Sequence, residues 1–184
     1  MKKSTIDLKD RMINTKNNCR DLVNKSNQLY DVLVGLRYEG KICFGRNLHE
    51  VSRLVNFFNK NLKTHLHLQK SLFLSLKDYL PRLEPAMTFL RAEHRELEIN
   101  LKILNFFTRE LYAHQDDTRR NLMIEKLRDR GIYFLHLLNN HFQMENGTIY
   151  DLVEKRLGVA QKKEILNKCL YGKVDHRDLS HFKN

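Results

Sequence analysis

The chain has 184 residues, of which 41% are hydrophobic and 30% are charged, with only seven glycines and two prolines. This composition argues against a disordered or all-β chain, since both classes use more glycine and proline, and it favours helices. No run approaches the roughly 18 uncharged apolar residues that a membrane span needs. The first residues meet charge at once, so no signal peptide is expected. We therefore expect one helical domain of a cytoplasmic protein.

The charge balance gives weaker information about possible partners than the composition gives about the fold. Basic residues outnumber acidic residues by 33 to 22, which gives a formal net charge of +11 and favours anionic partners. Nucleic acid is not the expected partner, because no recognition motif is present and acidic residues interleave with the basic ones. The three cysteines are widely spaced and form no CxxC pair, and a cytosolic chain would keep them reduced.

The apolar residues of the first half follow two helical stripes. Over residues 8–36 they recur at alternating steps of four and three, which is typical of a helix in a bundle. Glycines then bracket a predicted loop at residues 38–46. A second stripe covers residues 51–76, and Pro81 and Pro85 end it because proline is poorly tolerated inside a helix.

The second half repeats the pattern. A third stripe covers residues 87–104, and the polar residues 114–118 predict a linker. A fourth stripe covers residues 127–152. Residues 160–170 predict a short fifth helix, and the polar residues 171–184 predict a frayed tail.

Four helices of about 25 to 35 residues with shorter connections predict an all-α fold, an antiparallel four-helix bundle. We expect the bundle to occupy residues 1–157. Residues 158–184 would add a short helix and a polar C-terminal tail as an extension of the bundle.

Polar side chains interrupt three of the four stripes where a dry core needs apolar residues. They are His65 with Gln69, His94, and His141 with Glu145; Glu98 follows His94 by four residues and lies just beside the stripe. The spacing of four residues places both members of a pair on one side of a helix. Imidazole and carboxylate are ligands for iron, manganese and zinc, and bundle cores are where such metal sites are built. The alternative is that each histidine is only hydrogen-bonded to a neighbour in the core.

These residues resemble the hemerythrin-like, or HHE cation-binding, domains. Residues 90–94, Leu-Arg-Ala-Glu-His, match the L-x-x-E-H signature of the third helix of that family. Residues 141–145 are similar to its H-x-x-x-E segment on the fourth helix, with an apolar-aromatic pair following at 149–150. Residues 65–69 resemble the same motif on the second helix in altered form. The resemblance covers residues 5–157.

The resemblance implies a metal-binding protein without enzymatic activity. It would hold one or two non-haem iron ions in the bundle core and bind or sense O2, NO or iron. The metal ligands that it implies are His65, His94, His141 and Glu145, with Glu98 as an additional ligand. Glu93 is expected to orient a ligand from outside the coordination sphere.

The chain departs from the family at two positions. It has no histidine before His49, and at the corresponding depth of the first stripe only Cys19 is a normal iron ligand. On the second helix the neutral Gln69 stands where the family has a bridging carboxylate. A mononuclear site, a centre completed by water and a site without metal therefore stay open. The second hypothesis is a metal-free bundle that acts as a protein-interaction module, with the core polar residues forming a hydrogen-bond network.

Two further histidines, His67 and His136, fall two positions off their stripes. Such positions lie on the wrong side of an α-helix for the core. We expect both side chains at the surface.

Overall fold

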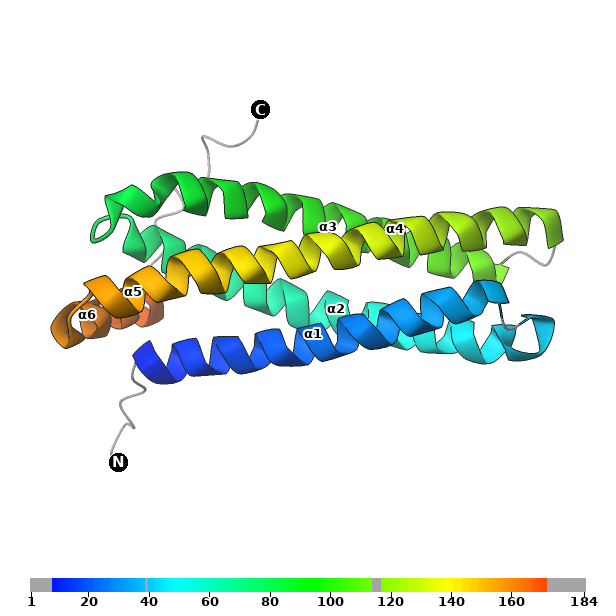
Figure 1. Ribbon diagram of the computed structural model, residues 1–184, viewed down its shortest axis with the longest axis horizontal. Helices are drawn as coiled ribbons and strands as arrows, with labels where there is room; N and C mark the ends of the chain where they lie inside the picture. Colours follow the sequence, from blue (N-terminus) through cyan, green and yellow to red (C-terminus); the bar gives the residue numbers. More distant parts are fainter. Residues whose placement is uncertain (1–7, 39, 114–116, 172–184) are drawn as a thin grey trace.

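A computed structural model describes residues 8–38, 40–113 and 117–171. Every element within these ranges is helical, which confirms the all-α class. The four long helices are α1 (Leu8–Tyr38), α2 (Gly40–Leu76), α3 (Glu84–Ala113) and α4 (Asp117–Met144). They lie side by side along the long axis of the molecule, and consecutive long helices run in opposite directions (Figure 1).

The break between α2 and α3 lies where the prolines predict it. The backbone N–H of Leu80 donates to the carbonyl of Leu76 at 2.9 Å, which closes the last turn of α2. Pro81 then begins the short 3-10 turn η1 (Pro81–Leu83), and Pro85 lies in the first turn of α3. Proline is tolerated in a first turn because the N–H that it lacks would have no partner within the helix there.

The predicted loop at residues 38–46 is wrong, because α2 begins at Gly40 and residues 40–46 are helical. Glycine disfavours a helix interior by about 1 kcal/mol relative to alanine. Packing offsets this cost, since the half-buried Phe44 contacts the apolar core. Gly45 itself faces open space.

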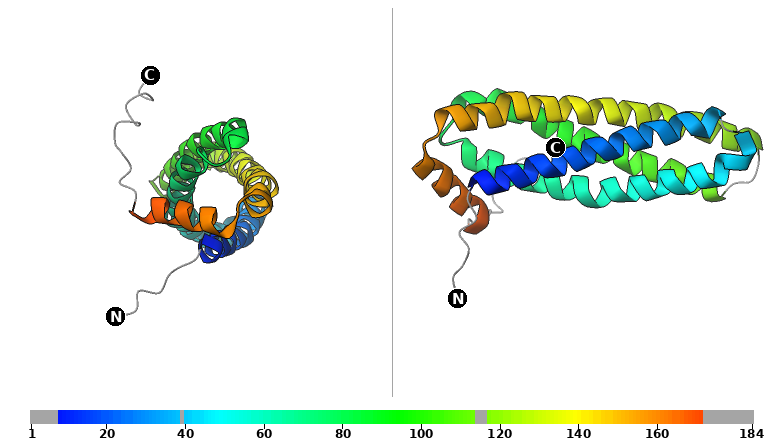
Figure 2. Two further views of the ribbon diagram at one scale, coloured as in Figure 1. Left: turned by 90° about the vertical axis from the view of Figure 1, so that its left-hand side faces the viewer. Right: turned by 60° about the horizontal axis from the view of Figure 1, so that its bottom comes forward.

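The fourth stripe is one continuous helical path with a widened turn. α4 passes directly into the π-helical turn η2 (Glu145–Tyr150), and α5 (Asp151–Arg156) continues from it. α6 (Val159–Tyr171) then turns back across one end of the bundle and contacts α2 and α1 (Figure 2). The predicted fifth helix is thereby confirmed, while the predicted tail beyond Tyr171 lies outside the described residues, as do residues 114–116 of the predicted linker.

The apolar core consists of two clusters that follow each other along the bundle. The larger cluster includes Leu66 of α2, Leu97 of α3 and Leu138 of α4. The smaller cluster lies toward α6 and includes the side chains of Phe73, Leu76, Leu90, Ile149 and Ile165. On α2, on α3 and on α4 with η2, the polar residues of the stripe lie where the two clusters adjoin. These buried polar residues are His65, Gln69, Glu93, His94, His141 and Glu145, and we call them the polar layer.

The helices approach each other closely at one glycine. A Cβ atom placed on Gly131 of α4 would collide with Leu33 Cδ1 of α1, and both residues are buried. The absence of a side chain at Gly131 therefore permits this α1–α4 contact. None of the helices in the described part of the chain has a stretch long and apolar enough to cross a membrane.

Candidate metal centre

Three potential ligand side chains from three elements meet at the polar layer. Cys19 of α1 places its Sγ 4.0 Å from His65 Nδ1 of α2 and 3.8 Å from Glu145 Oε2 of η2. His65 Nε2 lies 3.3 Å from Glu145 Oε2. One thiol, one imidazole and one carboxylate thus offer ligand atoms within 4.8 Å of one another, and this group could hold a metal ion. Within the described ranges it is the one such group of three found.

The Cys19 thiol donates to Glu145 Oε2, but two other atoms of this group lack an aligned hydrogen bond. Neither His65 Nε2 nor Glu145 Oε1 has a well-aligned hydrogen-bond partner among the described residues, although both atoms are fully buried. Buried polar atoms almost always have a partner, so an exception needs a reason. A cation between the donors would satisfy both atoms.

A second group extends the polar layer across the bundle. His141 Nδ1 lies 3.1 Å from Glu93 Oε2, and His141 Nε2 lies 3.1 Å from Gln69 Oε1. Metal-binding histidines usually donate one ring N–H to a carboxylate. This hydrogen bond leaves the lone pair of the other ring nitrogen available to the metal. A neutral imidazole that donates Nδ1–H to Glu93 then directs an Nε2 lone pair at the Gln69 side chain. That contact becomes favourable with a proton or cation between the two atoms, or with the amide turned so that its NH2 donates.

His94 completes the layer from α3. Its ring stacks on Phe73, with ring centroids 5.9 Å apart, and its centroid lies 4.8 Å from that of His141. His94 Nε2 is buried and has no hydrogen-bond partner within the described part of the chain. Burial, and then the neighbouring His141 and His65, lower the pKa of His94 from 6.5 to about 3. The ring is therefore neutral near neutral pH, which is the form that ligates metals.

Burial also sets the charge state of the other groups. It raises the pKa of the Cys19 thiol, and the nearby Glu145 carboxylate raises it further, so the thiol is protonated in the metal-free protein. Burial by itself raises the pKa of Glu145, but the contacts with His65, Tyr150 and His141 together outweigh this effect, and the pKa falls below its ordinary value. The layer thus holds a buried carboxylate charge whose main partner is the imidazole of His65.

The π-helical turn begins at Glu145. In a regular α-helix, residues five apart point in different directions, whereas the wider π-turn brings them toward the same side. Glu145 and Tyr150 are both buried as a result, with 0% and 1% of their surface exposed. Burial raises the pKa of the Tyr150 hydroxyl well above its ordinary value, and the adjacent Glu145 adds to the shift. Single π-turns inside α-helices occur frequently at functional sites.

The structure brings four of the five sequence-predicted ligands into the polar layer, namely His65, His94, His141 and Glu145. Glu98 is a correction, because its side chain is exposed on α3. The buried side of α3 carries Leu90, Leu97 and Leu101. Glu93 lies on this side of the helix, and Glu98 does not. Glu93 instead contacts His141, with Oε2 3.1 Å from Nδ1, and the orienting role expected for it stays a prediction.

Cys19 is the residue that the sequence-predicted ligand set lacks. Its place on the first stripe indicated the correct depth, but the thiol alone could not be distinguished from a small apolar core residue. The distances to His65 and Glu145 supply what the sequence could not.

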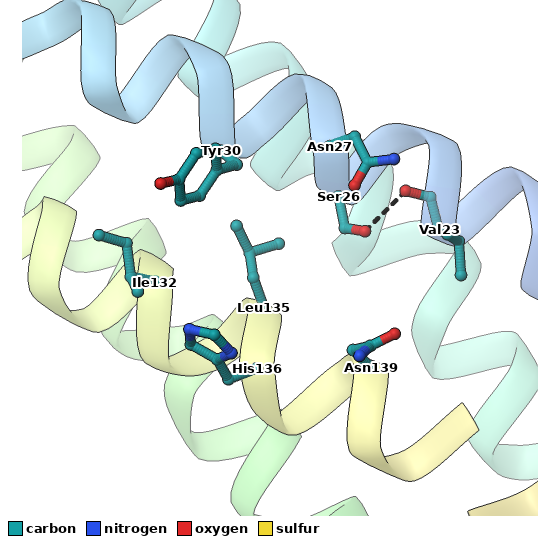
Figure 3. Close-up of a pocket in the computed structure, with 8 residues that line it drawn as sticks. All are labelled: Val23, Ser26, Asn27, Tyr30, Ile132, Leu135, His136 and Asn139. Atoms are coloured by element: carbon teal, nitrogen blue, oxygen red, sulfur yellow. Dashed lines mark hydrogen bonds between the residues drawn. The ribbon is translucent and has the colours of Figure 1, made fainter. Parts of the chain in front are cut away.

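The two off-stripe histidines lie at the surface, as predicted: His67 and His136 are both exposed. His136 lines a surface pocket between α1 and α4 (Figure 3). The lining of this pocket offers one imidazole and no carboxylate or thiol, so it lacks a metal-ligand set. Ser26 also lies there and donates to the carbonyl of Val23 at 2.7 Å, which places its hydroxyl outside the polar layer.

Comparisons with protein-family models, with curated proteins and with solved structures found no match to the chain.

Proposed function

We propose that this chain is a hemerythrin-like, metal-binding four-helix bundle that holds non-haem iron in its core and binds or senses O2, NO or iron. The proposal assigns it binding and no enzymatic activity. The motifs around His65, His94 and His141 support the likeness, together with the antiparallel course of the long helices.

The observation that carries the proposal is the convergence of buried donors in the polar layer. Cys19, His65 and Glu145 offer ligand atoms within 4.8 Å of one another, and none of the three residues is more than 4% exposed. A cluster of this kind that only stabilised the fold would be expected to hydrogen-bond fully. His65, His94 and Glu145 each present instead one buried atom without an aligned hydrogen bond, which is available to ligate an ion.

The donor set fits iron. Imidazole suits Fe2+, carboxylate suits harder ions, and thiolate suits softer ones, so a mixed set suits a borderline ion. His65 and Glu145 would hold the ion together with Cys19, and His94 and His141 would line the space beside it. When bound, iron supplies a coordination position at which a small molecule such as O2 or NO binds. The packed helices exclude water from that position.

The test is the metal content of the purified chain after expression in iron-supplemented medium, measured with its ultraviolet-visible spectrum. We expect iron near stoichiometry with ligand-to-metal charge-transfer bands. His65→Ala should abolish binding. The matched control is His67→Ala, which changes an exposed histidine two residues along the same helix. Equal metal content in both variants, or folded protein that takes up no iron anaerobically, would overturn the proposal.

A second candidate function is a metal-free bundle that acts as a protein-interaction module. The contacts of His141 with both Glu93 and Gln69 favour it, because they can close into a hydrogen-bond network without an ion. Thermal unfolding with and without chelator separates the two functions. A core metal raises the midpoint by binding the folded state, and a metal-free bundle shows no change.

A further inference from the structure

We infer that the centre binds a single divalent ion through the thiolate of Cys19, together with His65 and Glu145, and that it selects a borderline ion such as Fe2+, Co2+ or Zn2+. This inference rests on the proposed metal-binding function. It adds an ion count, a sulfur ligand and a class of metal to that function.

The position of Cys19 supports the sulfur ligand. Its Sγ lies within 4.0 Å of His65 Nδ1 and of Glu145 Oε2, and only 4% of the residue is exposed. The other two cysteines lie elsewhere. Cys43 contacts Arg46 on the exposed part of α2, and Cys169 of α6 contacts Ser71 and Ser75. Cys19 is therefore the cysteine among the described residues whose thiol meets other metal-binding donors.

The ligand charges support one ion rather than two. Metal binding to Cys19 releases the thiol proton to solvent and leaves a thiolate, because a coordinating thiol is deprotonated by the ion. The thiolate and the Glu145 carboxylate then carry two negative charges among the three ligands, which balance one divalent cation. The remaining carboxylate of the polar layer, Glu93, lies on the far side of His141 from Gln69, 3.1 Å from His141 Nδ1. Gln69 is neutral at the position where a second carboxylate could balance a further ion. An unbalanced charge in a buried layer is costly.

The same donors support the metal class. Thiolate is a soft ligand that selects against Mg2+, Ca2+ and Mn2+, whereas imidazole and carboxylate keep Fe2+, Co2+ and Zn2+ within range. Three protein ligands leave a coordination position for an outside ligand, as in open metal sites. His94 and His141 lie beside the group, with the His65 and His141 ring centroids 6.2 Å apart.

Anaerobic titration of the full chain, prepared metal-free, with Co2+ tests the inference. We expect one Co2+ ion per chain and a sulfur-to-cobalt charge-transfer band in the near ultraviolet. In the double variant Cys43→Ser/Cys169→Ser, Cys19 is the one remaining cysteine, and the band should persist. Cys19→Ser should lose the band and bind Co2+ more weakly by over about tenfold. The circular dichroism spectrum verifies that each variant is folded.

The possible failures are distinguishable. A double variant that binds Co2+ without the band shows that Cys19 is not a ligand, while metal binding itself stands. Two Co2+ ions per chain overturn the single-ion inference and leave the proposed function intact. A wild-type chain that stays folded and binds no Co2+ overturns the inference, and the anaerobic iron uptake measured separately then decides the proposed function. Because the double variant leaves Cys19 in place, the test does not depend on the folding of Cys19→Ser.

Discussion

His65 Nε2 and Glu145 Oε2 lie 3.3 Å apart at the centre of the bundle, and neither side chain is exposed to solvent. The two atoms are close enough to attract each other, yet His65 Nε2 lacks the alignment of a hydrogen bond. Two ligands of one ion lie close together without a hydrogen bond between them, because each directs its lone pair at the ion. The geometry of His65 and Glu145 is of this kind. In the proposed metal site this pair would therefore link the stability of the metal-free fold to the binding of metal.

Replacement of Glu145 by glutamine tests that link. Glu145→Gln keeps the shape of the side chain and removes its charge, so we expect a folded protein that has lost most of its metal. Elemental analysis measures the metal and circular dichroism measures the fold. The control is Glu154→Gln, which neutralises an exposed carboxylate on α5 that pairs with Lys162. Metal content in Glu145→Gln equal to that of the control would remove Glu145 from the ligand set.

Replacement of Gln69 by glutamate should act in the opposite direction. Gln69→Glu adds a carboxylate next to His141, and the added charge should raise the number of bound ions from one to two. The metal-free form should become less stable, by on the order of a few kcal/mol, because the new charge is buried. Cobalt titration and urea unfolding measure the two effects. Gln143→Glu on the exposed side of α4 is the control and should change neither. One ion in both variants would show that charge does not limit the ion count.

The metal-free protein should lose stability as the pH falls below neutrality. The pKa of His94 is 6.5 in the unfolded chain and about 3 in the fold. Above pH 6.5 the ring is neutral in both states, so its contribution is fully present. Between these two values the unfolded chain binds a proton that the folded protein rejects, and stability falls with pH.

The contribution of His94 is measured by urea unfolding in the presence of chelator, in steps from pH 8 to pH 4. His94→Leu should flatten the pH dependence by on the order of a few kcal/mol over this range. His67→Leu, at an exposed position, should leave the slope unchanged. An identical slope in His94→Leu and in the wild type would show that His94 is not the group responsible.

Two glycines in helix interiors should respond oppositely to alanine. Gly45→Ala should stabilise the protein by about 1 kcal/mol, since alanine favours the helix and nothing obstructs the added methyl group. Gly131→Ala should destabilise it by about 1 kcal/mol, because Leu33 must move within a packed core. Thermal unfolding of both variants measures the difference. A stabilised Gly131→Ala would show that the Leu33 side chain adjusts at little cost.

The sequence predicted the long helices well because their apolar period is regular and two prolines mark a boundary. It predicted the depth of His65, His94, His141 and Glu145 for the same reason. Helix period alone could not distinguish Glu93 from Glu98, since both lie near the edge of the stripe and packing decides which is buried. It also could not reveal the meeting of Cys19 with Glu145, which depends on how α1 packs against the π-turn. The start of α2 was missed because glycine propensity was outweighed by the packing of Phe44.

The two apolar clusters have a consequence for what can reach the polar layer. The layer is sealed lengthwise by packed leucine, phenylalanine and isoleucine side chains on both sides. A solute that approached from either end would have to partition among these apolar side chains. Its hydrophobicity would therefore matter as well as its size. Uncharged diatomic gases would lose little solvation there, whereas hydrated anions and sugars would lose much more. In the proposed metal site, access along the bundle would thus depend on the apolar residues that surround the site as well as on the donors within it.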